Sequence, residues 1–334
     1  MQCWTRRPPL VHWKRRAFSD SGRRYRNGQT HVAPSKALCS VRYIAHSSRH
    51  GSFQTVPTLA SWDRDTFQQR AFNPKLPALL PQDESKQPPA SQSWLETDHK
   101  RPSLRTLNFD YLTKYGDTSV PLELTQTESS GRQTFERFHA PLKLFLEWMQ
   151  QNQATTTANP STPSPSPRLY LAQCQISDLP QPLQADLPTP EVVLKAGKGD
   201  IYDANIWIGL PPTDTPLHRD PNPNFFLQLA GTKTVRLFPP EVGSEIFGSV
   251  QAKLGRNRSA VFRSEEMMQG EEREMLANQV WGDGDSSQLA PGLQVGGYEA
   301  TVEQGKALFI PLGWWHSIRS AGTGTTASVN WWFR

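Results

Sequence analysis

The chain of 334 residues has little cysteine, no long hydrophobic run and almost no acid in its first 50 residues. Its only cysteines are Cys3, Cys39 and Cys174, which excludes a disulfide scaffold and a cysteine-rich zinc site and fits a reducing compartment. No stretch approaches the ~20 consecutive apolar residues of a membrane-spanning helix. We therefore expect no membrane insertion.

Charge separates residues 1–50 from the rest of the chain. These residues hold 11 Lys and Arg side chains and a single acidic one, Asp20. Residues 51–334 hold 25 basic and 30 acidic side chains, so the net charge of +5 for the whole chain becomes −5 without the first 50 residues. This mildly acidic body gives no reason to expect nucleic-acid binding.

A segment that is rich in Arg, contains Ser and lacks both acid and a long apolar core is typical of a mitochondrial transit peptide. We therefore interpret residues 1–50 as a removable leader and expect the protein in mitochondria. The alternative is a basic tail that contacts RNA or holds the protein in the nucleus. A cytoplasmic location is the remaining alternative.

Residues 51–168 carry mixed patterns. Apolar side chains at 106–124 predict a short helix followed by a strand. Spacings of three and four among the apolar residues of 135–150 predict an amphipathic helix. Residues 153–168, QATTTANPSTPSPSPR, are rich in Thr, Ser and Pro, and we interpret them as a solvated loop insertion.

Short apolar runs recur from residue 169 to 334, separated by Pro, Gly and Asn. The runs are LYLAQ, NIWIGL, NFFLQLA, KTVRLF, ALFIPL and ASVNWWF. They predict a mainly β domain, a sandwich or jelly roll of antiparallel strands with flanking helices. Residues 241–297 interrupt the pattern with a charged helical segment at 264–278 and a Gly/Asp/Ser stretch at 282–297, and we expect this second insertion to face a substrate.

Two histidines of the β region have the surroundings of metal ligands. His218 and Asp220 form a His-X-Asp pair in TPLHRDPNPNFF, and residues i and i+2 of a strand point to the same face. His316 follows another apolar run, in LFIPLGWWHSIRS. Two His and one carboxylate form the facial triad of non-haem Fe(II) oxygenases. The other interpretation is ordinary polar residues near a β-turn, since Pro221 and Pro223 follow the pair.

Three more residues lie close to this pair in the sequence: Thr215, Asn224 and Lys233. A jelly roll could bring all three to one pocket. Lys233 lies among apolar residues, and a buried ammonium group needs an anionic partner, which a dicarboxylate such as 2-oxoglutarate would supply. The alternative is that Lys233 points outward from a turn at Gly231 and Thr232.

The chain resembles the JmjC-domain hydroxylases of the cupin superfamily, in particular the small arginyl and asparaginyl hydroxylases that consist of this domain alone. The resemblance rests on YLAQ, IWIGL, TPLHRDPNPNFFLQLAGTKTVRLFPP, KALFIPLGWWHSIRS and SVNWWF. Weaker similarity runs upstream through VPTLASWDRDTFQQRAF, LPALLP and NFDYLTKYGDTSVPLEL, so it covers residues 51–334. It implies a double-stranded β-helix with helices packed on its outside.

The resemblance also implies an Fe(II)- and 2-oxoglutarate-dependent dioxygenase. His218, Asp220 and His316 would bind the catalytic Fe(II), and dioxygen would be the other cosubstrate.

Five further residues would form the cosubstrate site by the same resemblance. Lys233, Thr215 and Tyr170 would hold the distal carboxylate of 2-oxoglutarate, and Asn224 and Asn330 would line the space around iron and cosubstrate.

The resemblance implies hydroxylation of a side chain in a protein or peptide. Asp220, where many demethylases of this fold have Glu, favours this reaction. Ala172 falls where one relative has a substrate-contacting Gln, so the substrate stays open. The alternatives are demethylation of N-methyl-lysine or N-methyl-arginine, hydroxylation of a tRNA base, and an inactive binding module.

Two features bear on partners. The chain ends four residues after Asn330, without the C-terminal helices that form the dimer of the asparaginyl hydroxylase, so we expect a monomer. The acidic side chains at 265–274 predict a solvated helical face.

Overall fold

The computed structural model describes residues 53–98, 101–127, 133–158, 167–255, 267–282 and 296–334. The predicted leader, residues 1–50, lies outside these ranges, as does most of the Gly/Asp/Ser stretch. No helix within the described ranges has both the length and the apolar character that a bilayer span requires.

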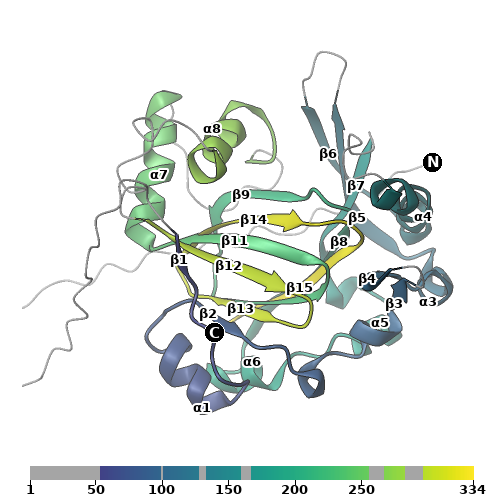
Figure 1. The fold of residues 1–334 in the computed structure, drawn as a ribbon, viewed down its shortest axis with the longest axis horizontal. Helices are drawn as coiled ribbons and strands as arrows, with labels where there is room; N and C mark the ends of the chain where they lie inside the picture. Colours follow the sequence, from purple (N-terminus) through teal and green to yellow (C-terminus); the bar gives the residue numbers. More distant parts are fainter. Residues whose placement is uncertain (1–52, 99–100, 128–132, 159–166, 256–266, 283–295) are drawn as a thin grey trace, which may run out of the picture. The chain divides into compact units, whose positions relative to one another are not determined.

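Eight consecutive strands form the centre of the molecule (Figure 1). They are β8 (Ile201–Gly209), β9 (Asp214–Arg219), β10 (Asn224–Ala230), β11 (Thr232–Phe238), β12 (Tyr298–Glu303), β13 (Ala307–Ile310), β14 (Trp315–Ala321) and β15 (Thr326–Phe333). Four of them run in the order β13-β10-β15-β8 in one sheet, and the other four in the order β12-β11-β14-β9 in the second sheet. Apolar side chains from both sheets pack together between them. The predicted double-stranded β-helix is confirmed.

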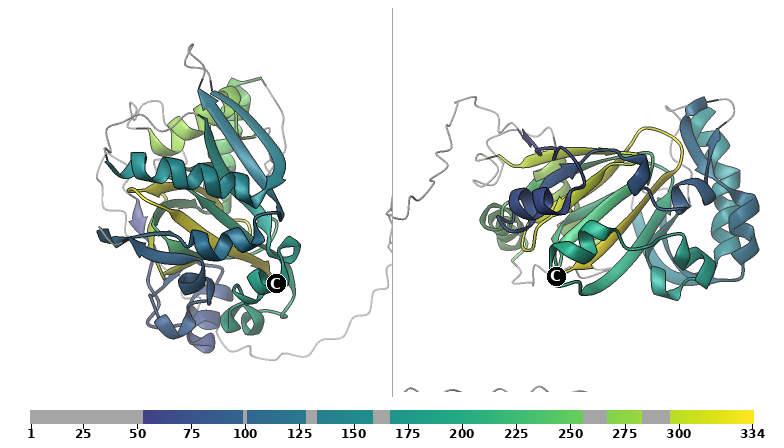
Figure 2. Two further views of the ribbon diagram at one scale, coloured as in Figure 1. Left: turned by 90° about the vertical axis from the view of Figure 1, so that its right-hand side faces the viewer. Right: turned by 90° about the horizontal axis from the view of Figure 1, so that it is seen from below.

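Further strands extend these sheets. β7 (Arg168–Gln175), β5 (Ser119–Thr127) and β6 (Gln133–Pro141) follow β8 in the larger sheet, β2 (Ala78–Leu80) pairs with β13, and β1 (Gln54–Thr55) pairs with β12. β3 (Leu95–Asp98) and β4 (Arg101–Leu107) form a separate pair. The hairpin of β5 and β6 projects beyond the barrel, as Figure 1 and Figure 2 both show.

Helices cover the outer faces of both sheets. The larger sheet is covered by α1 (Arg64–Phe67), α2 (Ala90–Ser93), α3 (Phe109–Leu112), α4 (Leu142–Ala158), α5 (Gln181–Ala185) and α6 (Glu191–Ala196), which share one apolar core with it. Short helical turns η1 (Gln68–Phe72), η2 (Glu84–Lys86), η3 (Thr113–Tyr115) and η4 (Ile176–Asp178) connect them. The smaller sheet is covered by α7 (Pro240–Lys253) and α8 (Gly270–Trp281).

The region before the barrel corrects one prediction. The predicted helix at 135–150 begins only at Leu142, because residues 133–141 pair with β5 as strand β6. Pro141 explains the boundary, since a proline disfavours helical geometry in the residue before it. The helix then continues to Ala158, so the first residues of the predicted loop 153–168 are helical and 159–166 lie outside the described residues. The predicted helix and strand at 106–124 are confirmed as α3 and β5.

Candidate active site

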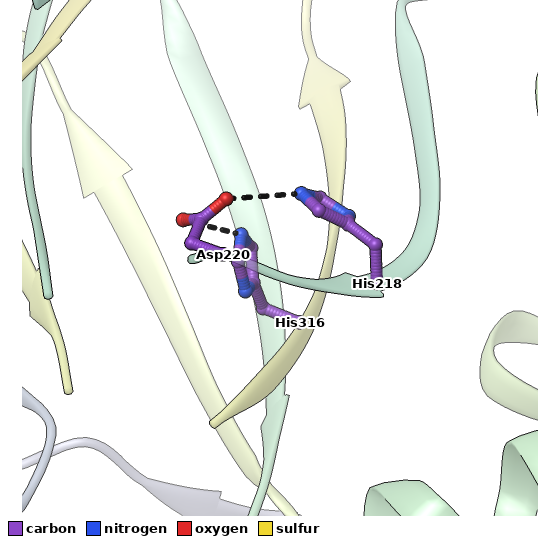
Figure 3. Close-up of side chains that lie close together, drawn as sticks. All are labelled: His218, Asp220 and His316. Atoms are coloured by element: carbon purple, nitrogen blue, oxygen red, sulfur yellow. Dashed lines mark ion pairs between the residues drawn. The ribbon is translucent and has the colours of Figure 1, made fainter. Parts of the chain in front are cut away.

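Three potential metal ligands converge in the interior of the barrel (Figure 3). His218 on β9 and His316 on β14 face each other as partners in an antiparallel pair, and Asp220 directly follows β9. Asp220 Oδ1 lies 3.6 Å from His218 Nε2, and Asp220 Oδ2 lies 3.5 Å from His316 Nε2. All three side chains are buried. The structure therefore brings the predicted triad together within 4.8 Å.

Hydrogen bonds orient this group. The Pro216 carbonyl oxygen lies 2.8 Å from His218 Nδ1, and because a carbonyl only accepts, we assign the proton to Nδ1 and the free lone pair to Nε2. Asn224 Nδ2 donates to Asp220 Oδ2 at 2.7 Å and fixes the carboxylate. Such outer contacts hold ligands in place for a metal.

The protonation state of His316 is also the one that metal binding requires. Burial, reinforced by the neighbouring His218, lowers the pKa of His316 to about 4, so the imidazole is neutral near pH 7. The neutral imidazole of His316 then faces His218 and the carboxylate of Asp220 at short range. A divalent cation between them could be coordinated by all three, and two His with one carboxylate suit Fe(II). The residues present therefore fit the metal.

Lys233 supplies the second charged group of the barrel interior. Its Nζ donates to Ser328 Oγ at 2.8 Å and to Tyr170 Oη at 3.3 Å, and lies 5.3 Å from the centre of the Phe226 ring. Burial lowers the pKa of Lys233 to about 7, and Lys233 forms no ion pair with any described carboxylate. Lys233 thus points inward, which decides between the two interpretations of the sequence and leaves an ammonium group without an anion.

Tyr170 reaches the interior from the strand beside the barrel. It pairs with Gly209 on β8, where an added Cβ would lie 2.5 Å from Tyr170 Cδ2, so only glycine lets the ring pass. Burial raises the pKa of the Tyr170 hydroxyl, so it stays protonated and can donate.

Two buried amides complete the interior. Asn330 Oδ1 accepts a hydrogen bond from Trp207 Nε1 at 2.8 Å, while Asn330 Nδ2 has no partner among the described residues. Asn224 Oδ1 likewise has none there. Thr215 on β9 pairs with Ile318 on β14, and both residues line the same cavity as His218 and His316. Unpaired buried polar atoms are rare, so they mark a place for a ligand.

One small cavity of about 40 Å³ is lined by all eight predicted site residues. It is also lined by Gln173, Trp207, Phe226, Ile318 and Trp332. Two residues of the interior were not predicted, Ser328 and Gln173. Ser328 shares the inner face of β15 with Asn330 two residues later, whereas Gln173 has a φ of 50° at a break in the β7 pairing, which has no sequence signal. Trp315, the residue before His316, packs against Phe247 on the outer side of the smaller sheet.

Curated proteins provide relatives over part of the chain. Lysine-specific demethylase JMJ30 of Arabidopsis thaliana is 28% identical over 228 residues, 67% of this chain and 45% of that protein. Lysine-specific demethylase 8 of Danio rerio is 31% identical over 165 residues, 49% of this chain and 36% of the relative. Jumonji C domain-containing protein 5 of Drosophila melanogaster is 23% identical over 286 residues, 83% of this chain and 59% of the relative.

The chain spans less than half the length of the first two of these relatives. A family model described as a cupin-like domain matches residues 51–334, which include the whole barrel and every site residue discussed above. With this match and the barrel fold together, the chain belongs to the cupin-like domain family.

Proposed function

We propose that this protein is an Fe(II)- and 2-oxoglutarate-dependent dioxygenase that hydroxylates a side chain of a protein. The observation that carries the proposal is that one cavity contains both a group of metal-binding side chains and a buried cation without an anionic partner. His218, Asp220 and His316 present lone pairs that call for a cation, and Lys233 presents a buried ammonium that calls for an anion. The names of the JmjC relatives support an oxygenase of this kind.

Each interior side chain would have a separate task. Fe(II), held by the triad, would supply the oxidising chemistry with dioxygen and 2-oxoglutarate as cosubstrates. Lys233 would neutralise the distal carboxylate of 2-oxoglutarate, and Tyr170 and Thr215 would donate hydrogen bonds to it. Asn224 holds the carboxylate of Asp220, and Asn330 and Trp207 hold each other at the side of the cavity.

The cavity must widen to admit the cosubstrate. Its volume is only about 40 Å³. A five-carbon dicarboxylate needs more room, so the side chains that line the cavity would move apart. Lys233 would then exchange its contact with Ser328 for one with the ligand.

The substrate class rests on the relatives and on the resemblance to arginyl and asparaginyl hydroxylases. The relatives named as lysine-specific demethylases favour one alternative, removal of a methyl group from N-methyl-lysine. Both reactions begin with hydroxylation of a C–H bond. In the hydroxylase this bond belongs to a side chain, and in the demethylase it belongs to an N-methyl group. Hydroxylation leaves a stable alcohol, whereas an N-hydroxymethyl group breaks down and releases formaldehyde.

The test is succinate release by the full chain, supplied with Fe(II) and 2-oxoglutarate and then exposed to air. We expect slow turnover that disappears in His218→Ala and requires far more 2-oxoglutarate in Lys233→Ala. His139→Ala is the matched control, because His139 is exposed on β6, outside the cavity. Absence of both succinate and iron-dependent 2-oxoglutarate binding would replace the proposal with the inactive binding module.

A second assay separates the reactions. Protein extracts and methylated peptides are incubated with the active enzyme, and products are read by mass spectrometry and by a formaldehyde assay. A stable gain of one oxygen on a protein supports the proposed hydroxylase. Formaldehyde with loss of a methyl group supports the demethylase, and modification of tRNA alone would contradict both.

We further infer a mitochondrial protein that acts as a monomer. The basic composition of residues 1–50 supports the first inference. Residues 1–50 fused to a fluorescent protein should reach mitochondria, and a nuclear signal would contradict this. Light scattering on the purified chain should give the mass of one chain, and a stable dimer would overturn the monomer.

A further inference from the structure

A second and larger cavity shares a wall residue, Tyr170, with the cavity that contains the metal ligands. Tyr170 lines both cavities, but the second, of about 640 Å³, contains none of His218, Asp220 and His316. Its walls come from β5, β6, β7, β9, β14 and the start of α8. A cavity of ~300–1,000 Å³ is the usual size of a small-molecule site.

Three guanidinium groups line this space, and we call it the arginine cavity, after Arg168, Arg273 and Arg319. Two of them share one carboxylate. Arg273 Nη2 lies 3.0 Å from Asp214 Oδ2, and Arg319 Nε lies 3.3 Å from Asp214 Oδ1. Each oxygen of Asp214 therefore already has its own arginine.

Arg168 is that third arginine. It lies two residues before Tyr170 on β7, so both side chains point to the same face of the strand, opposite the buried Leu169 and Leu171. Arg168 is half-buried, and its guanidinium group makes no hydrogen bond or ion pair with any described residue. Burial and then the charge of Arg273 lower the pKa of Arg168, and Asp214 opposes them without cancelling them. The guanidinium of Arg168 thus has no carboxylate partner among the described residues.

Two further carboxylates limit what the cavity can accept. Glu123 and Glu274 also line it, the first half-buried and the second exposed. A ligand that satisfies Arg168 must also offer hydrogen-bond donors to acidic neighbours. Hydroxyl groups on the ligand could donate these hydrogen bonds without adding positive charge.

We propose that the arginine cavity binds a small organic anion, which presents a carboxylate or phosphate group to Arg168 and Arg273 and a hydroxyl group to the rest of the wall. A planar guanidinium binds such oxyanions through two parallel hydrogen bonds. This site is distinct from the one proposed for 2-oxoglutarate and does not depend on iron or on turnover.

The test is calorimetric titration of the full chain at constant ionic strength with two probes, citrate and inorganic phosphate. We expect at least one probe to bind, and its dissociation constant to rise about tenfold or more in Arg168→Gln, as for loss of a charge-assisted bidentate contact. Arg64→Gln, an exposed arginine paired with Asp65 outside the cavity, should bind like the unchanged protein. Citrate binding alone would identify a carboxylate site, and phosphate binding alone a phosphate site.

Two controls keep the result specific. Melting curves of both arginine variants show whether the fold is retained, and Arg273→Gln provides a second disruption of the cavity if Arg168→Gln fails to fold. Lys233→Met should leave binding of the effective probe unchanged. Equal affinity in Arg168→Gln and the unchanged protein, loss of binding in Lys233→Met, or no binding of either probe would overturn the proposal.

Discussion

The two faces of the larger sheet differ in how they are buried. On β10 and β15 the outward side chains are apolar, including Phe225, Leu227 and Trp331, and they join the core beneath the helices. The inward side chains of the same strands include Asn224 and Asn330, which retain amide atoms without partners among the described residues. The apolar outer face is what packing requires, whereas the unpaired amide atoms of the inner face lower stability.

This difference separates residues that hold the barrel from residues that serve a ligand. Substitutions on the outer face should reduce stability first. Substitutions on the inner face should reduce ligand or metal binding while stability stays the same or rises. The following predictions test that separation, from the largest expected effect to the smallest.

Trp331→Ala should produce the largest loss of stability. Trp331 is 1% exposed on the outer face, and removing a buried tryptophan costs about 3–5 kcal/mol of unfolding free energy. Urea unfolding followed by circular dichroism measures it. Tyr202→Ala, 66% exposed on β8, is the control and should change stability by less than ~0.5 kcal/mol. Similar losses in the two variants would contradict the assignment of the outer face.

Lys233→Met should weaken ligand binding without reducing stability. Binding of 2-oxoglutarate should weaken by about 30- to 100-fold, which is ~2–3 kcal/mol, because the buried cation is lost. Stability without ligand should hold or increase, since an unpaired ammonium is removed from an apolar site. Calorimetry and urea unfolding give the two numbers. A less stable protein with unchanged affinity would place Lys233 among the structural residues.

Asn224→Ala should weaken metal binding by about 10- to 100-fold, because the hydrogen bond that orients Asp220 is lost. Mn(II), which resists oxidation, can be titrated and followed by electron paramagnetic resonance. Asn205→Ala is a close control: Asn205 is also fully buried on the inner face, but makes no hydrogen bond to Asp220. An equal loss of metal affinity in both variants would contradict a specific role of Asn224 in orienting Asp220.

Binding of 2-oxoglutarate should weaken about tenfold from pH 6 to pH 8. Burial lowers the pKa of Lys233 to about 7, so at pH 8 most molecules must take up a proton before the ammonium can pair with a carboxylate. Calorimetry in buffers of different ionisation enthalpy should show uptake approaching one proton at pH 8 and little at pH 6. Lys233→Met should abolish this uptake.

The unliganded protein should respond to pH in the other direction. Between pH 7 and about pH 10 the unfolded chain keeps the proton on Lys233 and the folded chain does not, so this residue makes the folded state more stable as pH rises. A contribution that fell over this interval would mean that Lys233 stays charged in the folded protein.

Local sequence patterns predicted the strands of the barrel, whereas the double-stranded β-helix and the proposed metal ligands followed from the resemblance to a known family. Apolar runs predicted the strands, and the i, i+2 spacing of His218 and Asp220 placed them on one face. The inward direction of Lys233 was not predictable, because it depends on the register of β11 between β12 and β14. The arginine cavity was not predictable either, because its residues come from six separate elements, β5, β6, β7, β9, β14 and α8.

Periodicity was also misleading in two places. The spacing of Phe135 and Phe138 resembles a helix, but pairing with β5 makes this segment a strand. The acidic segment predicted as a solvated face has Glu271 and Glu274 exposed on α8 as expected, while Glu272 is buried. Tertiary contacts decide such cases, and a single sequence does not contain them.

The separation of His218 and His316 by 98 positions has a consequence for biosynthesis. At ~5–20 residues per second, β14 leaves the ribosome about 5–20 seconds after β9. During that interval His218 and Asp220 exist without their third ligand, and the edge of β9 lacks its partner. Iron should therefore be acquired only at the end of folding, when the arrival of β14 completes both the ladder and the metal site.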